Sequence, residues 1–301
     1  MAERQLLMPS LQFFVLTTSN MKRAILPRNV SLKILRQALF NGAISGSEGA
    51  LRLGPLSMHS MITQLWRDRL DVVFPRCCVH CGDLAEGGRL RHLCPACERR
   101  LFVVGPPHCS TCGHPYFGET EINRLCEHCE ALVPEFGQGK TAILLKGPGR
   151  SLVHALKYHH ALHVLEDIAR VMAAVPGYAD YLGDAVLIPV PLHSRKERER
   201  HYNQSLLLAQ TAAQITDGRT RVEELLRRVV DTESQTHYDR EARQKNLKNA
   251  FALAPGATIN PALRYILVDD VFTTGSTLNA CAGVLRRAGA LNLDVVTFGH
   301  G

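Results

Sequence analysis

Residues 265–277 read YILVDDVFTTGST, and this stretch decides the fold of the chain. Its apolar start predicts a buried strand over 265–269 that ends in two carboxylates, Asp269 and Asp270. A turn of small residues follows and opens a helix expected over 276–288. A buried strand joined by a turn to a helix is the building unit of a parallel α/β sheet, whose ligands bind at the carboxyl ends of the strands.

The turn after the two acids has the composition of a phosphate cradle. Gly275 allows the backbone to approach a ligand closely, and the first amides of the helix present the positive end of its dipole. Asp269 and Asp270 are suited to accept hydrogen bonds from sugar hydroxyls or to hold Mg²⁺. The stretch therefore predicts a site for a phosphorylated ribose, and the alternative is an ordinary helix start with Ser276 as N-cap. The hydroxyl groups of the cradle belong to Thr273, Thr274, Ser276 and Thr277.

Residues 138–301 alternate between strand-like and helix-like segments. Strands are expected at 141–145, 185–190 and 294–298, and an amphipathic helix is expected over 203–215. This alternation predicts an α/β domain in which helices cover both faces of a parallel sheet.

Nine of the ten cysteines lie between residues 77 and 129, and eight of them form four Cys-x-x-Cys pairs. Two facing pairs supply the four sulfurs of a tetrahedral zinc site, so the pattern predicts two zinc ribbons in tandem. Pairing within each ribbon is the simplest arrangement, and interleaved pairing is the alternative. The two predicted ligand sets are Cys78, Cys81, Cys94 and Cys97, and Cys109, Cys112, Cys126 and Cys129.

Zinc held by four thiolates has no open coordination position, so a structural role is predicted for both metals. Cys77 is interpreted as a spare thiol, although it could replace Cys78 at a longer spacing. The nearby histidines, including His92 and His114, are interpreted as surface residues. Paired cysteines in a chain without a clear signal peptide favour zinc in a reducing compartment, so we expect a cytoplasmic protein.

The composition excludes several classes of protein. A chain of 301 residues with 46% hydrophobic and 21% charged residues is typical of soluble globular proteins with about two domains. Its apolar runs are far shorter than the roughly 20 residues that span a bilayer, so no membrane span is predicted. The net charge of +7 is weak support for nucleic-acid binding, because residues 1–60 hold seven Lys or Arg against two acids.

Residues 1–65 contain no convincing motif and are expected to form an uncharacterised extension. Their acid-poor composition, which contains Ser and Arg, is one feature of organelle transit peptides. The alternative is a start codon assigned too far upstream, with Met58 or Met61 as the first residue.

Several motifs together resemble one known family. Val268–Thr277 resembles the PRPP-binding motif of type I phosphoribosyltransferases, and its combination with the upstream ribbons resembles the ComF/GntX family of competence-associated proteins. The resemblance covers about residues 62–298 and implies a double zinc ribbon over 66–135 and a phosphoribosyltransferase-like domain over 138–301. Further matching segments are Leu156-Lys-Tyr158, Pro189-Val-Pro191, Arg200-His-Tyr-Asn-Gln204 and Lys245-Asn-Leu-Lys-Asn-Ala-Phe251.

The resemblance implies a role for each matching residue. Leu156–His159 matches the first βα turn, where Lys157 would face the diphosphate of PRPP, and an ordinary solvated helix lysine is the alternative. Asp269 and Asp270 would bind the ribose hydroxyls and orient Mg²⁺, and the turn 273–277 would hold the 5′-phosphate. The basic segment with Arg195, Lys196, Arg198 and Arg200 resembles a mobile flap, in which Arg200 is the expected ligand contact.

Two imidazoles depart from the family pattern. His160 and His201 stand where family members often have glycine, which implies a stiffer pyrophosphate loop. A spectator role is expected for both, and phosphate contacts are the alternative.

Two functions of different classes follow. The first is an enzyme that acts on PRPP, whose acceptor the sequence does not identify because no residue declares itself a general base. The second is a DNA-uptake adaptor that binds single-stranded DNA or a competence helicase through its ribbons. The ribbons offer few aromatic residues for base stacking, chiefly Tyr116 and Phe117, which favours partner docking over direct DNA contact.

Overall fold

The computed structural model describes residues 76–117, 125–230 and 249–301, which all lie in one compact unit, His59–Gly301. The expectations for residues 1–65, including a start at Met58 or Met61, lie outside the described residues. No helix in the described part of the chain is long and apolar enough to cross a membrane.

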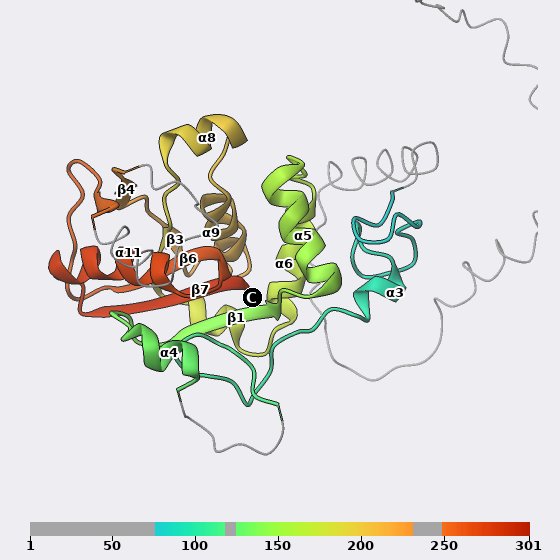
Figure 1. The fold of residues 1–301 in the computed structure, drawn as a ribbon, viewed down its shortest axis with the longest axis horizontal. Coiled ribbons are helices and arrows are strands. Elements are labelled where there is room, and N and C mark those ends of the chain that lie inside the picture. The colour runs from blue at the N-terminus through green and yellow to red at the C-terminus, as the bar shows by residue number, and fades with distance from the viewer. Residues whose placement is uncertain (1–75, 118–124, 231–248) are drawn as a thin grey trace, which may run out of the picture. The chain divides into compact units, whose positions relative to one another are not determined.

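A five-stranded sheet forms the centre of the fold (Figure 1). Its strands follow the order β1-β7-β6-β2-β3, and every neighbouring pair is parallel. The prediction of a parallel sheet flanked by helices is confirmed. The strands are β1 (Gly139–Leu144), β2 (Ala185–Pro189), β3 (Arg221–Val222), β6 (Arg264–Phe272) and β7 (Asn292–His300).

Alternate strand residues face two separate hydrophobic cores. Leu187 and Ile266 belong to one core, whereas their chain neighbours Val186 and Tyr265 belong to the other. The strands are apolar on both sides, as is typical of parallel strands that are buried on both faces. The sheet can therefore carry helices on each face.

Helices α5, α6 and α9 contribute to one core, and α11 contributes to the other together with an antiparallel pair of strands, β4 and β5. Within the described residues of this domain the helices are α5 (Gly147–Tyr158), α6 (Val164–Ala174), α7 (Tyr178–Leu182), α8 (Ser194–Arg200), α9 (Gln204–Gln214) and α11 (Ser276–Arg287). The paired strands are β4 (Leu226–Arg228) and β5 (Phe251–Leu253).

The two cysteine-rich ribbons pack into different cores. The first ribbon, which contains helix α3 (Pro95–Glu98), buries Leu90 and Leu93 in the core of α5 and α6. The second ribbon, which contains helix α4 (Glu127–Leu132), buries Leu132 in the core of α11. The ribbons therefore lie on opposite faces of the sheet.

The connector between the ribbons runs along the edge of the sheet. The amide of Val104 donates to the carbonyl of Ala142 at 2.9 Å, and the amide of Leu144 donates to the carbonyl of Phe102 at 2.9 Å. Val103 forms an antiparallel bridge with Ile143. Residues 102–104 thus satisfy the outward-facing carbonyl of Ala142 and amide of Leu144 on the edge strand β1.

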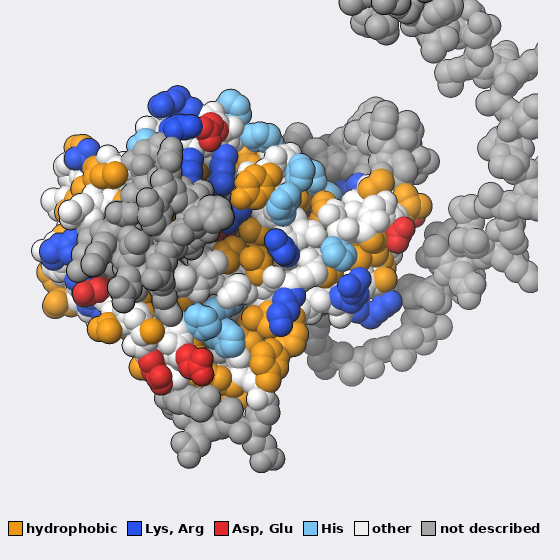
Figure 2. Space-filling model, in the orientation of Figure 1, with side chains coloured by type: hydrophobic (Ala, Val, Ile, Leu, Met, Phe, Trp, Pro, Cys, Tyr) orange, Lys and Arg blue, Asp and Glu red, His pale blue; other side chains and the backbone are white. Residues whose placement is uncertain are grey.

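The direction of the connections changes between β2 and β6. The chain leaves β2 toward β3, whereas it leaves β6 toward β7 on the other side. A crevice at the carboxyl ends of the strands is expected at such a point. On the face seen in Figure 2, Lys, Arg and His side chains gather over α8 and the nearby end of α5.

Strand β6 is longer than predicted. Its pairing with β2 ends at Val268, but its pairing with β7 continues to Phe272. The expected strand end at Asp269 is therefore wrong, because hydrogen bonds to one neighbour are enough to keep residues 269–272 extended. The acidic pair lies within the strand, beyond the end of β2.

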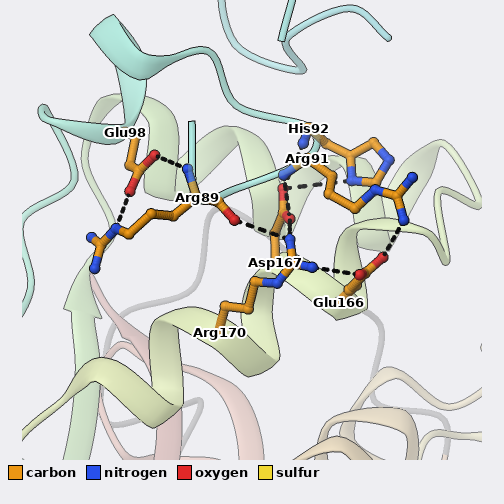
Figure 3. A network of polar contacts seen from close by, with 7 residues as sticks. All are labelled: Arg89, Arg91, His92, Glu98, Glu166, Asp167 and Arg170. Carbon is orange, nitrogen blue, oxygen red and sulfur yellow. Dashed lines mark hydrogen bonds and ion pairs between the residues drawn. The ribbon is translucent and has the colours of Figure 1, made fainter. Parts of the chain in front are cut away.

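Asp167 attaches the first ribbon to α6 (Figure 3). This fully buried carboxylate accepts hydrogen bonds from the amides of Arg91 and His92, both at 2.7 Å. Burial raises the pKa of Asp167, but hydrogen bonds from the His92 side chain and these amides outweigh it, so the pKa lies below its ordinary value. His92, with a side chain only 12% exposed, is not the surface residue that was expected.

Exposed ion pairs surround this buried contact. Arg170 donates to the carbonyl of Arg89 at 3.0 Å and to Glu166 at 2.7 Å. Glu166 also lies 3.5 Å from Arg91. Such exposed pairs contribute little to stability, so Asp167 is the main polar contact of this interface, beside the apolar contacts of Leu90 and Leu93.

We expect Asp167→Asn to lower the free energy of unfolding by about 1–3 kcal/mol, because one of the two ribbon amides then faces an NH₂ group. The measurement is urea unfolding of the zinc-loaded chain. Because folding lowers the pKa of Asp167, its contribution is complete above the unfolded pKa of about 3.9 and is lost as the pH falls through the folded value. The difference between wild type and variant should therefore persist at pH 5.

The control is Glu166→Gln on the same helix, whose side chain is 42% exposed. Its effect should stay within about 0.5 kcal/mol. Equal stabilities of Asp167→Asn and wild type at neutral pH would contradict the role given to Asp167.

Candidate functional site

A lysine and two acids meet at the carboxyl end of β2. Lys157 Nζ lies 2.9 Å from Asp270 Oδ1, and both side chains are largely buried, at 23% and 11% exposed. The resemblance placed Lys157 in the first βα turn, but the structure does not. That turn is Leu145–Lys146, and Lys157 occupies the last turn of α5. The lysine reaches the acids from the helix end.

Asp269 is held by two hydrogen bonds to the same oxygen. Its Oδ1 accepts from Ser205 Oγ at 2.9 Å and from the amide of Asp270 at 2.9 Å. Burial, followed by the negative charge of Asp270, raises the pKa of Asp269 to about 7, although Lys157 and the hydrogen bonds oppose the shift. The pair of acids therefore shares less than two negative charges near neutral pH.

The start of α9 positions Ser205. Asn203 caps this helix by accepting a hydrogen bond from the amide of Ser205, and its Nδ2 donates to the carbonyl of Val190 at 3.1 Å. Between them, Gln204 is 1% exposed, and its Nε2 has no partner among the described residues. Sequence reasoning missed Ser205, although it directly follows the Tyr202-Asn203-Gln204 run that was singled out.

The hydroxyl-rich turn joins β6 to α11. Gly275 has a φ of +72°, a left-handed conformation that favours glycine. Thr274 Oγ1 lies 3.0 Å from Ser276 Oγ and accepts from the amide of Ser276 at 3.4 Å. Thr273 is exposed, and Thr277 is partly buried in the first turn of α11. Ser276 is the first residue of the helix, and Gly275 is its N-cap.

The basic segment forms helix α8 and touches the end of α5. The guanidinium of Arg200 lies 5.4 Å from the centre of the Tyr158 ring, and Tyr202 donates a hydrogen bond to the carbonyl of Leu156. His160 and His201 face each other with ring centres 5.7 Å apart. Both histidines have a left-handed φ, +50° and +63°, a conformation that side chains other than glycine rarely adopt.

The eight paired cysteines gather into two groups. Within each group the four sulfurs lie within 4.8 Å of one another. Tetrahedral zinc with bonds of about 2.3 Å needs sulfurs about 3.8 Å apart. The separations of 3.6 Å for Cys81 and Cys94 and 3.9 Å for Cys109 and Cys129 fit this value. The grouping follows the arrangement within each ribbon, and both groups are consistent with structural zinc. Their members are Cys78, Cys81, Cys94 and Cys97, and Cys109, Cys112, Cys126 and Cys129.

Of the histidines near the second cluster, His114 differs from the expected surface position. His114 is partly buried, and its ring centre lies 4.7 Å from that of His300 at the end of β7. Burial lowers the pKa of His300 to about 4, with a further contribution from His114. His114 therefore packs against the sheet domain, whereas His128 is exposed.

Comparisons with known proteins match both parts of the chain. Residues 69–130 match the model of the double zinc ribbon domain. Competence protein F of Haemophilus influenzae is 32% identical over 229 residues, 72% of this chain and 94% of that protein. The DNA utilization protein YhgH of Salmonella typhi is 32% identical over 67% of this chain and 88% of that protein.

Among solved structures, a purine phosphoribosyltransferase from Pyrococcus horikoshii Ot3 is similar to 46% of this chain. The match covers 74% of that protein with 15% identity and a TM-score of 0.28.

The raised pKa of Asp269 predicts a pH-dependent stability. A carboxyl whose pKa is raised by folding binds its proton more tightly in the folded state, so stability falls as the pH rises from about 4 toward about 7. Asp269→Asn imitates the protonated acid and keeps its acceptor for Ser205. We expect the stability advantage of this variant over wild type to be larger at pH 8, where the folded wild type has lost the proton of Asp269, than at pH 5.

Urea unfolding of both proteins at the two pH values measures this effect, because the other titrating groups cancel in the comparison. An advantage of Asp269→Asn that is the same at pH 5 and pH 8 would contradict the raised pKa.

Proposed function

Because this chain belongs to the ComF family, we propose that it binds PRPP or a related phosphoribosyl compound where β2 and β6 end. The observation that carries the proposal is the acid pair with its lysine, next to a hydroxyl-rich turn that opens α11. This combination lies at the point where the connections of the sheet change direction. A sugar with an anionic group at one end would place its hydroxyls at the acid pair and its anionic group at the turn.

In this proposal each group of the site contacts one part of the ligand. Asp269 and Asp270 accept hydrogen bonds from the ribose hydroxyls, because carboxylate oxygens are acceptors and hydroxyl groups are donors. The hydroxyls of the turn and the first amides of α11 donate to the 5′-phosphate, whose charge the helix dipole stabilises. Arg200, already beside Tyr158 at the end of α5, supplies a cation from α8.

Mg²⁺ is proposed to accompany PRPP. The two carboxylates supply the oxygen ligands that this hard cation prefers, and a cation beside them would offset the burial and the charge of Asp270 that raise the pKa of Asp269. When bound, the ion would neutralise part of the diphosphate charge. Lys157 is then available to exchange its ion pair with Asp270 for one with the diphosphate.

The reaction class proposed is phosphoribosyl transfer. The bond from C1 of the ribose to a pyrophosphate oxygen breaks, and pyrophosphate leaves with the electron pair. A nucleophile of the acceptor forms the new bond to C1. The residues of this chain hold the sugar and stabilise the departing charge, so positioning and electrostatics provide the acceleration. We further propose that the reaction serves DNA uptake or utilisation, in line with the names of the relatives.

A second candidate function is the adaptor that binds single-stranded DNA. An exposed aromatic pair favours it: Phe102 and Phe117 are 43% and 63% exposed, and their ring centres lie 5.6 Å apart. Bases stack on such exposed rings. A gel shift with single-stranded DNA that disappears in Phe117→Ser, while PRPP binding is retained, would favour the adaptor.

Calorimetry with PRPP and Mg²⁺ tests the first proposal. We expect saturable binding by wild type and at least about tenfold weaker binding by Asp270→Ala, because a hydrogen bond to a charged group is lost. The control is Asp180→Ala, whose side chain is 84% exposed on α7, close to the amino end of β2. Its affinity should equal that of wild type. Absence of binding by wild type at millimolar PRPP would overturn the proposal.

A further inference from the structure

The hydroxyl-rich turn, residues 273–277, packs against the second ribbon at Gly275. A Cβ atom at Gly275 would lie 2.5 Å from Phe272 Cζ and 2.6 Å from Leu132 Cδ2. Leu132 is the last residue of α4, and α4 begins directly after Cys126 and contains Cys129. Two ligands of the second cluster therefore fix the helix against which the turn packs.

Hydrogen bonds join the same helix end to the first turns of α11. Asn279 Oδ1 accepts from the amide of Glu135 at 2.6 Å, and Asn279 Nδ2 lies 3.4 Å from the carbonyl oxygen of Val133. Arg286, farther along α11, donates to the carbonyl of Glu135 at 2.8 Å. The segment that follows α4 is thus bonded to α11 at two places.

A stack of rings makes a third connection. Phe272, the last residue of β6, stacks on His300 with ring centres 5.1 Å apart. His300 contacts His114, which lies two residues after Cys112. The end of the strand that carries both acids therefore rests, through His300, on the second ribbon.

The sheet itself is attached to the second cluster. Thr141 Oγ1 donates to the carbonyl of Cys112 at 2.9 Å, and the amide of Gly139 donates to the carbonyl of Ser110 at 2.8 Å. The first ribbon is attached elsewhere, through Asp167 on α6 and through a 2.9 Å hydrogen bond between His80 and Ser151 on α5. The two clusters thus support different parts of the fold.

We infer that metal bound at Cys109, Cys112, Cys126 and Cys129 controls the shape of the turn 273–277 and so its affinity for an anion, whereas metal at the first cluster does not. The two sites are coupled through α4, which is fixed at its start by the metal ligands and at its end by Gly275 and Asn279. The inference rests on the proposed function in one respect, that the anion is the phosphate of a phosphoribosyl ligand.

Two matched variants test this coupling. Cys94 and Cys126 are each the third cysteine of their cluster and the N-cap of a short helix, with no side-chain capping bond. Serine is a preferred N-cap, so Cys94→Ser and Cys126→Ser each remove one metal ligand while they retain the helix start. Zinc content of the full-length proteins, measured by mass spectrometry, should fall by about one equivalent in each variant.

Hydrogen exchange and calorimetry then compare the two variants. In Cys126→Ser we expect faster exchange in a peptide covering residues 272–279 and about tenfold weaker binding of PRPP with Mg²⁺. In Cys94→Ser both quantities should match wild type. Equal exchange rates in the two variants after equal zinc loss would overturn the inference.

Asn279→Ala provides a test that leaves all eight cysteines intact. It removes the hydrogen bonds of Asn279 to the segment after α4 and leaves that of Arg286, so it should retain both zinc ions yet accelerate exchange over 272–279. This variant decides the question if Cys126→Ser fails to fold, and unchanged exchange in it would then overturn the inference. If wild type does not bind PRPP, the proposed function fails, but the exchange experiment still measures the coupling because it needs no ligand.

Discussion

Strand β6 keeps its hydrogen bonds to β7 after β2 has ended, and this one-sided pairing determines the rest of the site. Residues 269–272 of β6 remain extended, yet the side of the strand that faces β2 has no neighbouring strand there among the residues that the structure describes. Side chains from α5 and α9 reach this open edge, which is why Lys157 can pair with Asp270 and Ser205 can bond to Asp269. A sheet with equal strand lengths would have buried these acids against a neighbouring strand.

The cysteine-rich part of the chain is integrated with the sheet. One ribbon contributes to each of the two cores, and the connector between them lies along β1. Metal clusters of this kind are usually regarded as small independent modules, but here their carbonyls and helices complete the packing of another domain. The ribbons and the sheet therefore form one packed unit.

Those features of the fold that depend on residues close together in the sequence could be predicted from it. The apolar run before Asp269 and the spacing of the cysteines are local patterns, so the strand, the turn, the helix and the cysteine pairs could be expected. The ion pair of Lys157 and the hydrogen bond of Ser205 could not, because each joins segments that only the register of the sheet brings together. The burial of His92 likewise depends on Asp167, which lies 75 residues away along the chain.

The connector 102–104 has a consequence for the metal-depleted chain. An uncovered edge strand offers free amides and carbonyls that recruit strands of other molecules. Here the covering segment is held in place by a ribbon at each of its ends, and small ribbons of this kind depend on bound metal for their stability. We therefore expect withdrawal of zinc to expose β1 as a template for self-association.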